Sequence, residues 1–275
     1  MKTTIGVMGC GWLGLPLAQA LVLKGHTVHG STTSAHKMEV LEKEGIVPFN
    51  IRLAPHSISS SMPSFLANTT TLIINIPPKL RSGTGENYIA KMNLVLDALA
   101  QSSVKNVIFV SSTSVYGSAK GTVTEETIPQ PVTASGKQLL EVETLFKQKK
   151  AFNTTIVRFG GLIGPNRHPI TNLAGKQLQT NGDAPVNLIH LDDCIRIITT
   201  IIDNNYWNDT FNGVYPYHPT KREFYTEMAA KTGLQPPHYK TINKGIGKRV
   251  TPNRLVNVKN FEFKTSILSA YTTEK

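Results

Sequence analysis

Cysteine and tryptophan are scarce in this chain of 275 residues, which has two of each. Cys10 and Cys194 cannot form a disulfide framework, so a reducing cytoplasm is the expected compartment. No run of 18 apolar residues occurs, and the sequence therefore predicts no membrane span. The first 14 residues lack a basic segment followed by an apolar stretch and a cleavage site. We expect them to form a strand rather than a secretory signal.

Acidic residues are also few, with 18 Asp and Glu against 29 Lys and Arg, a net charge of +11. Between Lys221 and Lys264 ten basic residues face three acidic ones, so most of the excess lies there. That stretch is either a solvated basic surface or a rim that attracts an anionic small-molecule substrate. Nucleic acid is not an expected partner, because the sequence has no recognition-helix motif and no interleaved aromatic platform.

Short apolar runs alternate with helical stretches through the first 165 residues, and the apolar content of 40% is enough for a sizeable core. Strands are expected at 3–8, 26–30, 46–51, 70–76, 107–111 and 154–159, and helices at 15–24, 34–44, 86–101 and 135–149. Such alternation predicts an α/β fold, namely a Rossmann-type doubly wound parallel sheet. We assign residues 1–165 to this domain and residues 166–275 to a smaller C-terminal substrate lobe.

Two helix starts carry specific predictions. Ser34 is expected to cap the helix over 34–44, and Asp192 or Asp193 is expected to cap a helix over 192–202. A further helix is expected over 221–232, ending before Gly233.

Residues 9–14 read GCGWLG, which is the spacing G-x-G-x-x-G between a strand and a helix. In this context Gly9 permits a tight turn, Gly11 lets the backbone approach a pyrophosphate, and Gly14 lets the helix pack closely on the sheet. The helix N-terminus adds free N–H groups and partial positive charge. The sequence thus predicts a dinucleotide site whose loop contacts are Gly9, Gly11, Trp12, Leu13 and Gly14. Cys10 is expected to be a small filler rather than a nucleophile.

The segment after the second strand bears on which dinucleotide binds. An NAD site usually has an acidic residue about 20 residues beyond the loop, but no acid occurs here before Glu39. Hydroxyl and basic side chains that suit a 2′-phosphate occupy the segment instead, namely Ser31, Thr32, Thr33, Ser34 and Lys37. This favours NADP as the cofactor, with NAD as the alternative; Ser34 is able both to cap a helix and to bind phosphate.

Three later segments carry a family resemblance. Residues 110–117 (VSSTSVYG) resemble the S-S-x-x-V-Y-G segment of the extended short-chain dehydrogenases, the NAD-dependent epimerase/dehydratase family. Residues 158–165 (RFGGLIGP) and 187–193 (NLIHLDD) are similar to two further segments of that family, in the same order. With the glycine loop they span residues 5 to about 195. The resemblance implies an oxidoreductase or epimerase-like enzyme that acts on a sugar-type or anionic carbonyl or hydroxyl substrate.

The resemblance also implies roles for single residues. Ser112 would hydrogen-bond the substrate, and Lys137 would hold the nicotinamide ribose. The cofactor cleft would be lined by Asn75, Ile76, Pro77, Ser111, Phe159, Gly160 and Gly161. Each of Ser112, Lys137 and Asn75 also has a purely structural interpretation, as a turn residue, a solvated lysine and a backbone partner. By analogy with many family members, helices 86–101 and 135–149 would form a homodimer.

One departure from the family is serious. The catalytic pair of the family is Y-x-x-x-K, and residues 133–137 read TASGK, so Thr133 stands in the place of the tyrosine. An aliphatic hydroxyl is too weak an acid to replace a phenol, so we expect Thr133 to orient a group rather than to transfer a proton. Tyr116, Tyr215 or Tyr217 would be alternative acids; otherwise turnover is very slow. The competing hypothesis is a non-catalytic NADP(H)-binding sensor or scaffold protein.

Two other chemistries are not expected. His190, Asp192 and Cys194 are close in sequence, but no further ligand cluster accompanies them, and we predict no metal site. A hydrolase triad is not expected either, because the G-x-S-x-G elbow is missing.

Overall fold

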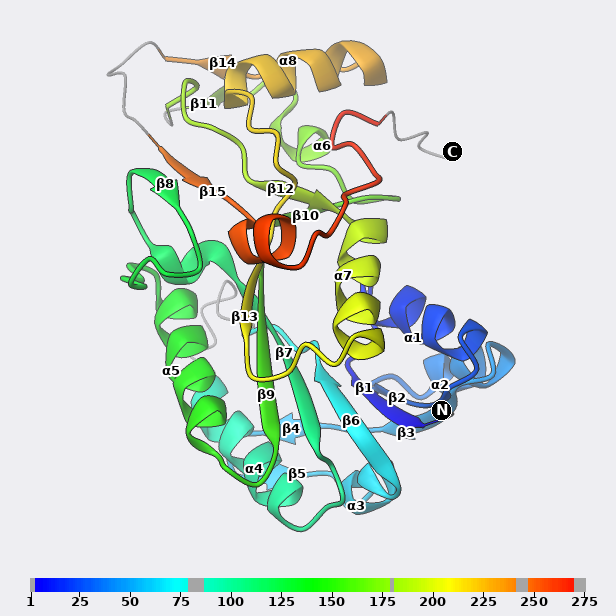
Figure 1. Ribbon diagram of the computed structural model, residues 1–275. Coiled ribbons are helices and arrows are strands. Elements are labelled where there is room, and N and C mark those ends of the chain that lie inside the picture. The colour runs from blue at the N-terminus through cyan, green and yellow to red at the C-terminus, as the bar shows by residue number, and fades with distance from the viewer. Residues whose placement is uncertain (1–2, 79–86, 179–180, 241–246, 270–275) are drawn as a thin grey trace.

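A computed structural model describes residues 3–78, 87–178, 181–240 and 247–269. Its centre is a sheet of seven strands in the order β13-β9-β7-β6-β1-β2-β3, in which every neighbouring pair is parallel (Figure 1). The strands are β1 (Thr4–Met8), β2 (Thr27–Thr32), β3 (Val47–Asn50), β6 (Thr69–Ile74), β7 (Asn106–Ser112), β9 (Asn153–Phe159) and β13 (Thr210–Gly213). This architecture confirms the doubly wound α/β fold.

Helices cover both faces of the sheet, as the strand sequences require. Side chains alternate along β6, so Leu72 and Ile74 pack into one hydrophobic core and Ile73 into the other. The first core lies under α3 (Met62–Leu66), α4 (Tyr88–Ala100) and α5 (Ala134–Gln148). The second lies under α1 (Gly14–Leu23), α2 (His36–Lys43) and α7 (Leu191–Asp203). Strands that are buried on both faces read as continuous apolar runs, which is why the sequence identified them.

A smaller lobe sits beyond the carboxyl ends of the strands (Figure 1). It contains β10 (Gly161–Ile163), α6 (Ile170–Leu173), β11 (Gln177–Leu178), β12 (Leu188–His190), α8 (Lys221–Thr232) and β14 (His238–Tyr239). Its own core includes Ile163, Val186, Phe224 and Met228. Among the described residues, no helix is long and apolar enough to cross a membrane.

Short elements complete the chain. A small antiparallel hairpin, β4 (Leu53–Ala54) and β5 (Ser57–Ile58), follows β3. The 3₁₀ turn η2 (Thr113–Tyr116) follows β7, and β8 (Gly121–Val123) pairs with β15 (Lys248–Val250) from the far end of the chain. The π-helical turn η3 (Arg254–Val258) comes after β15.

Both predicted helix caps were wrong. The N-cap of α2 is Ala35, which makes no side-chain bond. The Ser34 hydroxyl is instead hydrogen-bonded to the His36 ring, 2.7 Å away. The N-cap of α7 is His190, whose Nδ1 accepts the Asp192 N–H at 3.2 Å. Asp193 is instead fully buried, where its carboxylate accepts the backbone N–H groups of Lys264 and Thr265. It thereby holds the C-terminal tail against α7.

The seventh strand was not anticipated. β13 lies beyond residue 165, yet it pairs with β9 over four residues, from Thr210 opposite Ile156 to Gly213 opposite Phe159. The preceding helix α7 packs against α1 in the second core. We therefore propose that residues 191–213 belong with the sheet, and that the lobe consists of two segments on either side of them.

Candidate functional site

The three loop glycines lie at the carboxyl edge of the sheet between β1 and α1, and each meets a different constraint. Gly9 has φ +100°, and a Cβ there would lie 2.8 Å from the Asn75 carbonyl oxygen. A Cβ on Gly14 would lie 2.1 Å from the Gly9 carbonyl oxygen, so the helix can approach only without a side chain. A Cβ on Gly11 would have nothing within 4 Å. Gly11 therefore faces open space at the N-terminus of α1, which fits a pyrophosphate.

Two predicted cofactor contacts instead hold this loop in shape. The buried Ser31 hydroxyl accepts the Gly9 N–H at 2.9 Å, and the Asn75 amide donates to the Gly9 carbonyl at 3.2 Å. Ile76 accepts the Tyr88 hydroxyl through its carbonyl at 2.7 Å, and Pro77 is exposed beside it. Ser31 and Asn75 thus position the backbone that a dinucleotide would approach.

Trp12 connects the glycine loop to the end of the segment 158–165 and to Arg167, which the sequence analysis did not single out. Its indole N–H donates to the Pro165 carbonyl at 2.9 Å, and the Arg167 guanidinium lies 4.9 Å above its ring. Leu13, next to it, is buried in the second core. Trp12 therefore fixes the loop against the segment after β10, and Arg167 places a cation on the Trp12 ring.

The end of β2 carries hydroxyls and, unexpectedly, an arginine. Thr32 is buried and its hydroxyl accepts the Ser34 N–H at 3.2 Å, whereas Thr33 and Lys37 are exposed. The exposed Arg52 donates to the Thr33 carbonyl at 3.4 Å. Because β2 and β3 are parallel and pair up to Thr32 opposite Asn50, the residues after them share one edge. That pairing was the signal that could have identified Arg52 from the sequence.

The predicted catalytic residues come together where α5 begins. The Ser112 hydroxyl accepts the Ser114 N–H at 3.1 Å and caps η2. The Thr133 hydroxyl accepts the Gly136 N–H at 3.0 Å and caps α5. A Cβ on Gly136 would lie 2.9 Å from the Ser114 carbonyl oxygen, so the first turn of α5 packs directly on η2. Lys137 is exposed on that first turn.

Ser111 lies elsewhere than expected, in a buried polar network beneath the site. Its hydroxyl donates to Glu143 at 2.6 Å, and Glu143 accepts two N–H groups of Arg158, at 2.5 and 3.0 Å. Arg158 also donates to the Tyr116 hydroxyl at 2.9 Å, which in turn donates to Asn212 at 2.8 Å. Tyr116 is fully buried, and burial raises its pKa. It is therefore a structural residue and not an available acid.

The residues at the end of β9 connect the sheet to the lobe. Gly160 donates to the Gly213 carbonyl at 3.0 Å, and Gly161 donates to the Asn187 carbonyl at 2.8 Å. Phe159 is buried against Gly213, where a Cβ would lie 2.3 Å from its ring. Of the two lobe tyrosines, Tyr215 packs edge-on against Phe263, while Tyr217 is exposed.

A lysine of the lobe, Lys248, reaches the turn after Ser112. Its ammonium donates to the carbonyls of Thr113 and Gly117, at 2.8 and 3.0 Å, and burial lowers its pKa. The pairing of β15 with β8 brings it there from 135 residues away. Sequence reasoning missed it because nothing local distinguishes it from the other lysines of the basic lobe.

Metal ligation has no geometric support in the described part of the chain. No group of three or more His, Cys, Asp or Glu residues there could hold an ion. His190 serves as a helix cap instead.

Burial raises the pKa of Cys10 to about 12, so its thiol is protonated near neutrality.

The comparisons with known proteins agree with this geometry. The sequence model of the NAD dependent epimerase/dehydratase family matches residues 5–212. The chain belongs to this family. Protein YeeZ of Escherichia coli K12 is 36% identical over 262 residues, which cover 94% of this chain and 95% of YeeZ.

Solved structures share the fold of this chain at low sequence identity. MoeE5 in complex with UDP-glucuronic acid and NAD aligns with a TM-score of 0.78 at 20% identity, over 99% of this chain and 97% of that one. UDP-glucose 4-epimerase from Thermotoga maritima with UDP-glucose gives a TM-score of 0.80 at 18% identity, over 98% and 96%. The family resemblance found in the sequence is confirmed.

Proposed function

We propose that the protein binds a nicotinamide dinucleotide at the carboxyl edge of its sheet and acts on a sugar-type, anionic substrate as an oxidoreductase or epimerase-like enzyme. The observation that carries this proposal is Gly11. It is flanked by two glycines that admit no side chain, yet a Cβ on Gly11 itself would meet nothing. The loop is therefore built around space for a ligand next to a helix N-terminus, as a bound diphosphate requires.

The residues around the loop fit such a cofactor. Gly11 and the first turn of α1 would hold its diphosphate, with Trp12 and Arg167 at the side. Lys137, exposed on the first turn of α5, would hold the nicotinamide ribose, and Phe159, Gly160 and Gly161 would border the nicotinamide. When bound, the cofactor supplies hydride transfer, and the protein supplies position and charge.

The end of β2 favours NADP over the NAD found in the MoeE5 complex. Arg52 and Lys37 are both exposed there, and the Thr33 and Ser34 hydroxyls precede Lys37 in sequence. A 2′-phosphate would gain charge-assisted hydrogen bonds from the guanidinium, each worth roughly 1.5–3 kcal/mol.

Calorimetry with NADPH and NADH tests this preference. We expect the wild type to bind NADPH more tightly, and Arg52→Ala to weaken NADPH binding about tenfold, which is about 1.4 kcal/mol, with NADH binding unchanged. Lys43→Ala, a surface change on the neighbouring helix α2, is the control. Equal affinity of the wild type for the two cofactors would refute the preference, and no binding of either would refute the proposed function.

The substrate is inferred from charge and from the neighbours. The lobe that faces the site is basic, and the two structural neighbours hold UDP-glucuronic acid and UDP-glucose. We therefore expect a nucleotide-sugar or a similar anionic compound, bound near Ser112. NADPH oxidation with a panel of carbonyl compounds, and conversion of UDP-glucose and UDP-glucuronic acid, would test this activity directly.

A non-catalytic dinucleotide-binding protein is the second candidate function, and the environments of two residues support it. The Thr133 hydroxyl is occupied as the cap of α5, and Tyr116 is buried in the network beneath the site. Neither is placed to move a proton. Tight cofactor binding with no turnover on the panel would select this candidate.

A further inference from the structure

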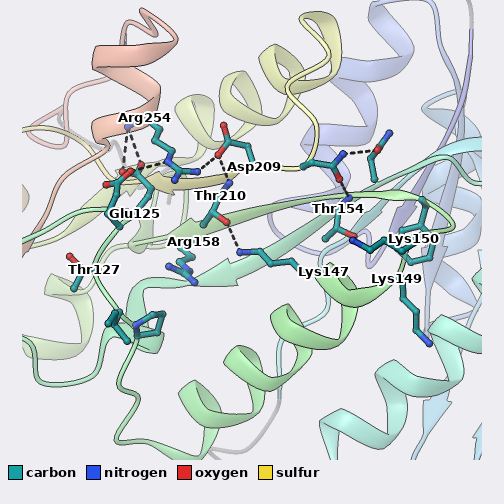
Figure 2. Close-up of a pocket in the computed structure, with 16 residues that line it drawn as sticks. Glu125, Thr127, Lys147, Lys149, Lys150, Thr154, Arg158, Asp209, Thr210 and Arg254 are labelled. Atoms are coloured by element: carbon teal, nitrogen blue, oxygen red, sulfur yellow. Dashed lines mark hydrogen bonds and ion pairs between the residues drawn. The ribbon is translucent and has the colours of Figure 1, made fainter.

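One cavity beside the sheet lies away from the candidate site. A cavity of about 670 Å³ lies between the last turn of α5, the starts of β9 and β13, and Arg254 of η3 (Figure 2). Its volume is in the range of small-molecule pockets. None of the residues predicted to bind cofactor or substrate lines it. Along α5, Lys147 at the cavity is ten residues from Lys137, about 15 Å at 1.5 Å per residue.

The acidic residues of the cavity are already neutralised within it. Arg254 donates through its side chain to Glu126 at 3.0 Å and, in a close contact, to Asp209. The Glu125 carboxylate accepts the backbone N–H groups of Asn212 and Arg254, at 3.0 and 3.3 Å. These carboxylates are therefore paired on one wall, at the upper left of Figure 2.

The opposite wall carries ammonium groups without such partners. Lys147 donates to the Thr210 hydroxyl at 2.8 Å, and no carboxylate lies within salt-bridge distance of it in the described part of the chain. Partial burial of its ammonium lowers the pKa of Lys147, although the side chain as a whole is exposed. Lys149 and Lys150 line the same wall (Figure 2). Part of this charge compensates the carbonyl end of α5, but three lysines within four residues exceed what that end requires.

An apolar surface completes the cavity. Ile128 is 78% exposed, although it is a large aliphatic side chain, and it lines the cavity together with Pro129 and the buried Phe152. Hydrogen bonds hold the polar part of the lining in place: Asn208 accepts the Thr154 N–H at 3.0 Å and donates to Asn153 at 2.7 Å. The cavity thus presents cations and apolar contacts on preformed walls.

We propose that this cavity is a second binding site, for a small organic phosphate. The phosphoryl group would be held by the ammonium groups of Lys147 and Lys150, which act as compact point charges, and Lys149 adds positive charge at the edge of the cavity. The organic part would cover Ile128 and Pro129. The site is independent of the dinucleotide site, so its existence does not rest on the proposed function.

Phenyl phosphate is the probe that tests both halves of this assignment. Its binding is measured by calorimetry in a buffer without phosphate, with and without excess NADPH. We expect saturable binding that NADPH does not displace, and weaker binding of inorganic phosphate and of phenol. Lys147→Gln should weaken phenyl phosphate binding about tenfold. Lys43→Gln, which also removes a lysine from the last turn of a helix, should leave it unchanged.

Three results would overturn the proposal: no saturable binding, equal binding by the wild type and Lys147→Gln, or displacement by NADPH, which would place the probe at the glycine loop. If Lys147→Gln does not fold, the double variant Lys149→Gln/Lys150→Gln replaces it, because both side chains are exposed. Ile128→Ser should weaken phenyl phosphate but not inorganic phosphate. Equal effects on both probes would contradict the placing of the organic part.

Discussion

The residues of the glycine loop differ in what a side chain would meet at each position. Gly14 allows α1 to start in contact with the Gly9 carbonyl, and Gly9 itself adopts a backbone conformation that other residues rarely take. Both are needed for the fold. Gly11 has neither constraint, so the protein itself does not require glycine there, and under the proposed function the bound dinucleotide does.

Gly11→Val should therefore affect ligand binding, and Gly14→Ala should affect stability. We expect Gly11→Val to keep its stability within about 0.5 kcal/mol, as open surface changes do, and to lose dinucleotide binding. Gly14→Ala should lower the melting temperature, because its Cβ would overlap a carbonyl oxygen. Calorimetric titration and thermal unfolding measure the two effects. A folded Gly11→Val variant with normal cofactor affinity would show that the loop assignment is wrong.

His168 makes stability depend on pH. Its Nδ1 accepts the Ile170 N–H at 3.2 Å, its ring stacks on Phe224, and burial lowers its pKa from 6.5 to about 4. Between these values the unfolded chain binds more protons than the folded chain, so this group makes stability fall as pH falls from 6.5 to 4. The full loss from this one ring is up to ~3 kcal/mol.

Urea unfolding at pH 7 and pH 4.5 measures this effect. His168→Asn, which keeps an acceptor for Ile170, should show a smaller loss of stability than the wild type. His36→Asn, at an exposed position, should behave like the wild type. The wild type and His168→Asn losing the same stability would contradict the assignment to His168.

At the scale of elements, the N-terminus of α5 is the part of the candidate site where a threonine caps a helix. Thr133 caps α5 through the Gly136 N–H, as Thr220 caps α8 in a capping box with Glu223. Under the proposed function, the first turn of α5 positions Lys137 for the cofactor. The residue in the tyrosine's place thus acts on the helix rather than on the substrate.

Thr133→Ala should therefore cost about 1 kcal/mol of stability, while Thr133→Ser should cost little. Any measured turnover should change less in Thr133→Phe than in Lys137→Ala, because the lysine would also hold the ribose. Denaturant unfolding and steady-state rates check the two statements. Loss of turnover in Thr133→Phe with unchanged cofactor affinity would assign the chemistry to Thr133 and contradict this interpretation.

The elements that the sequence predicted are those whose pattern is local. β1, β6 and β9 each contain a short stretch of apolar residues, and the glycine loop lies within six residues, so both could be recognised without the fold. β13 could not, because its four residues include Asn212 and Gly213, which are unfavourable in strands and are retained by contacts with β9 and Tyr116. Arg52, Arg167 and Lys248 were missed because strand pairing or packing brings each to its place from a distant segment.

At the scale of the whole molecule, one buried polar network joins segments that lie far apart in the sequence. Glu143 of α5 and Arg158 of β9 form a buried ion pair, with side chains 2% and 5% exposed. Tyr116 continues the network to Asn212, which also donates to the Thr251 carbonyl at 3.1 Å. A buried guanidinium is tolerated only with such partners.

Glu143→Gln should destabilise the protein by about 3–5 kcal/mol, because it leaves the Arg158 charge buried without a counterion. The double variant Glu143→Gln/Arg158→Met should recover a large part of that loss, since it removes the charge as well. Urea unfolding of the wild type, both single variants and the double variant gives the coupling directly. Additive losses in the double variant would mean that the pair contributes nothing specific to stability.

The position of β13 at the sheet edge also has a consequence for how the chain is made. Tyr116 and Arg158 leave the ribosome well before Asn212, and Thr251 follows later still. Until then the growing sheet has an unpaired β9 edge, and the Tyr116 hydroxyl lacks its acceptor Asn212. Nascent chains with such edges are prone to aggregate. We therefore expect the nascent chain to be most prone to aggregate between synthesis of β9 and of β13.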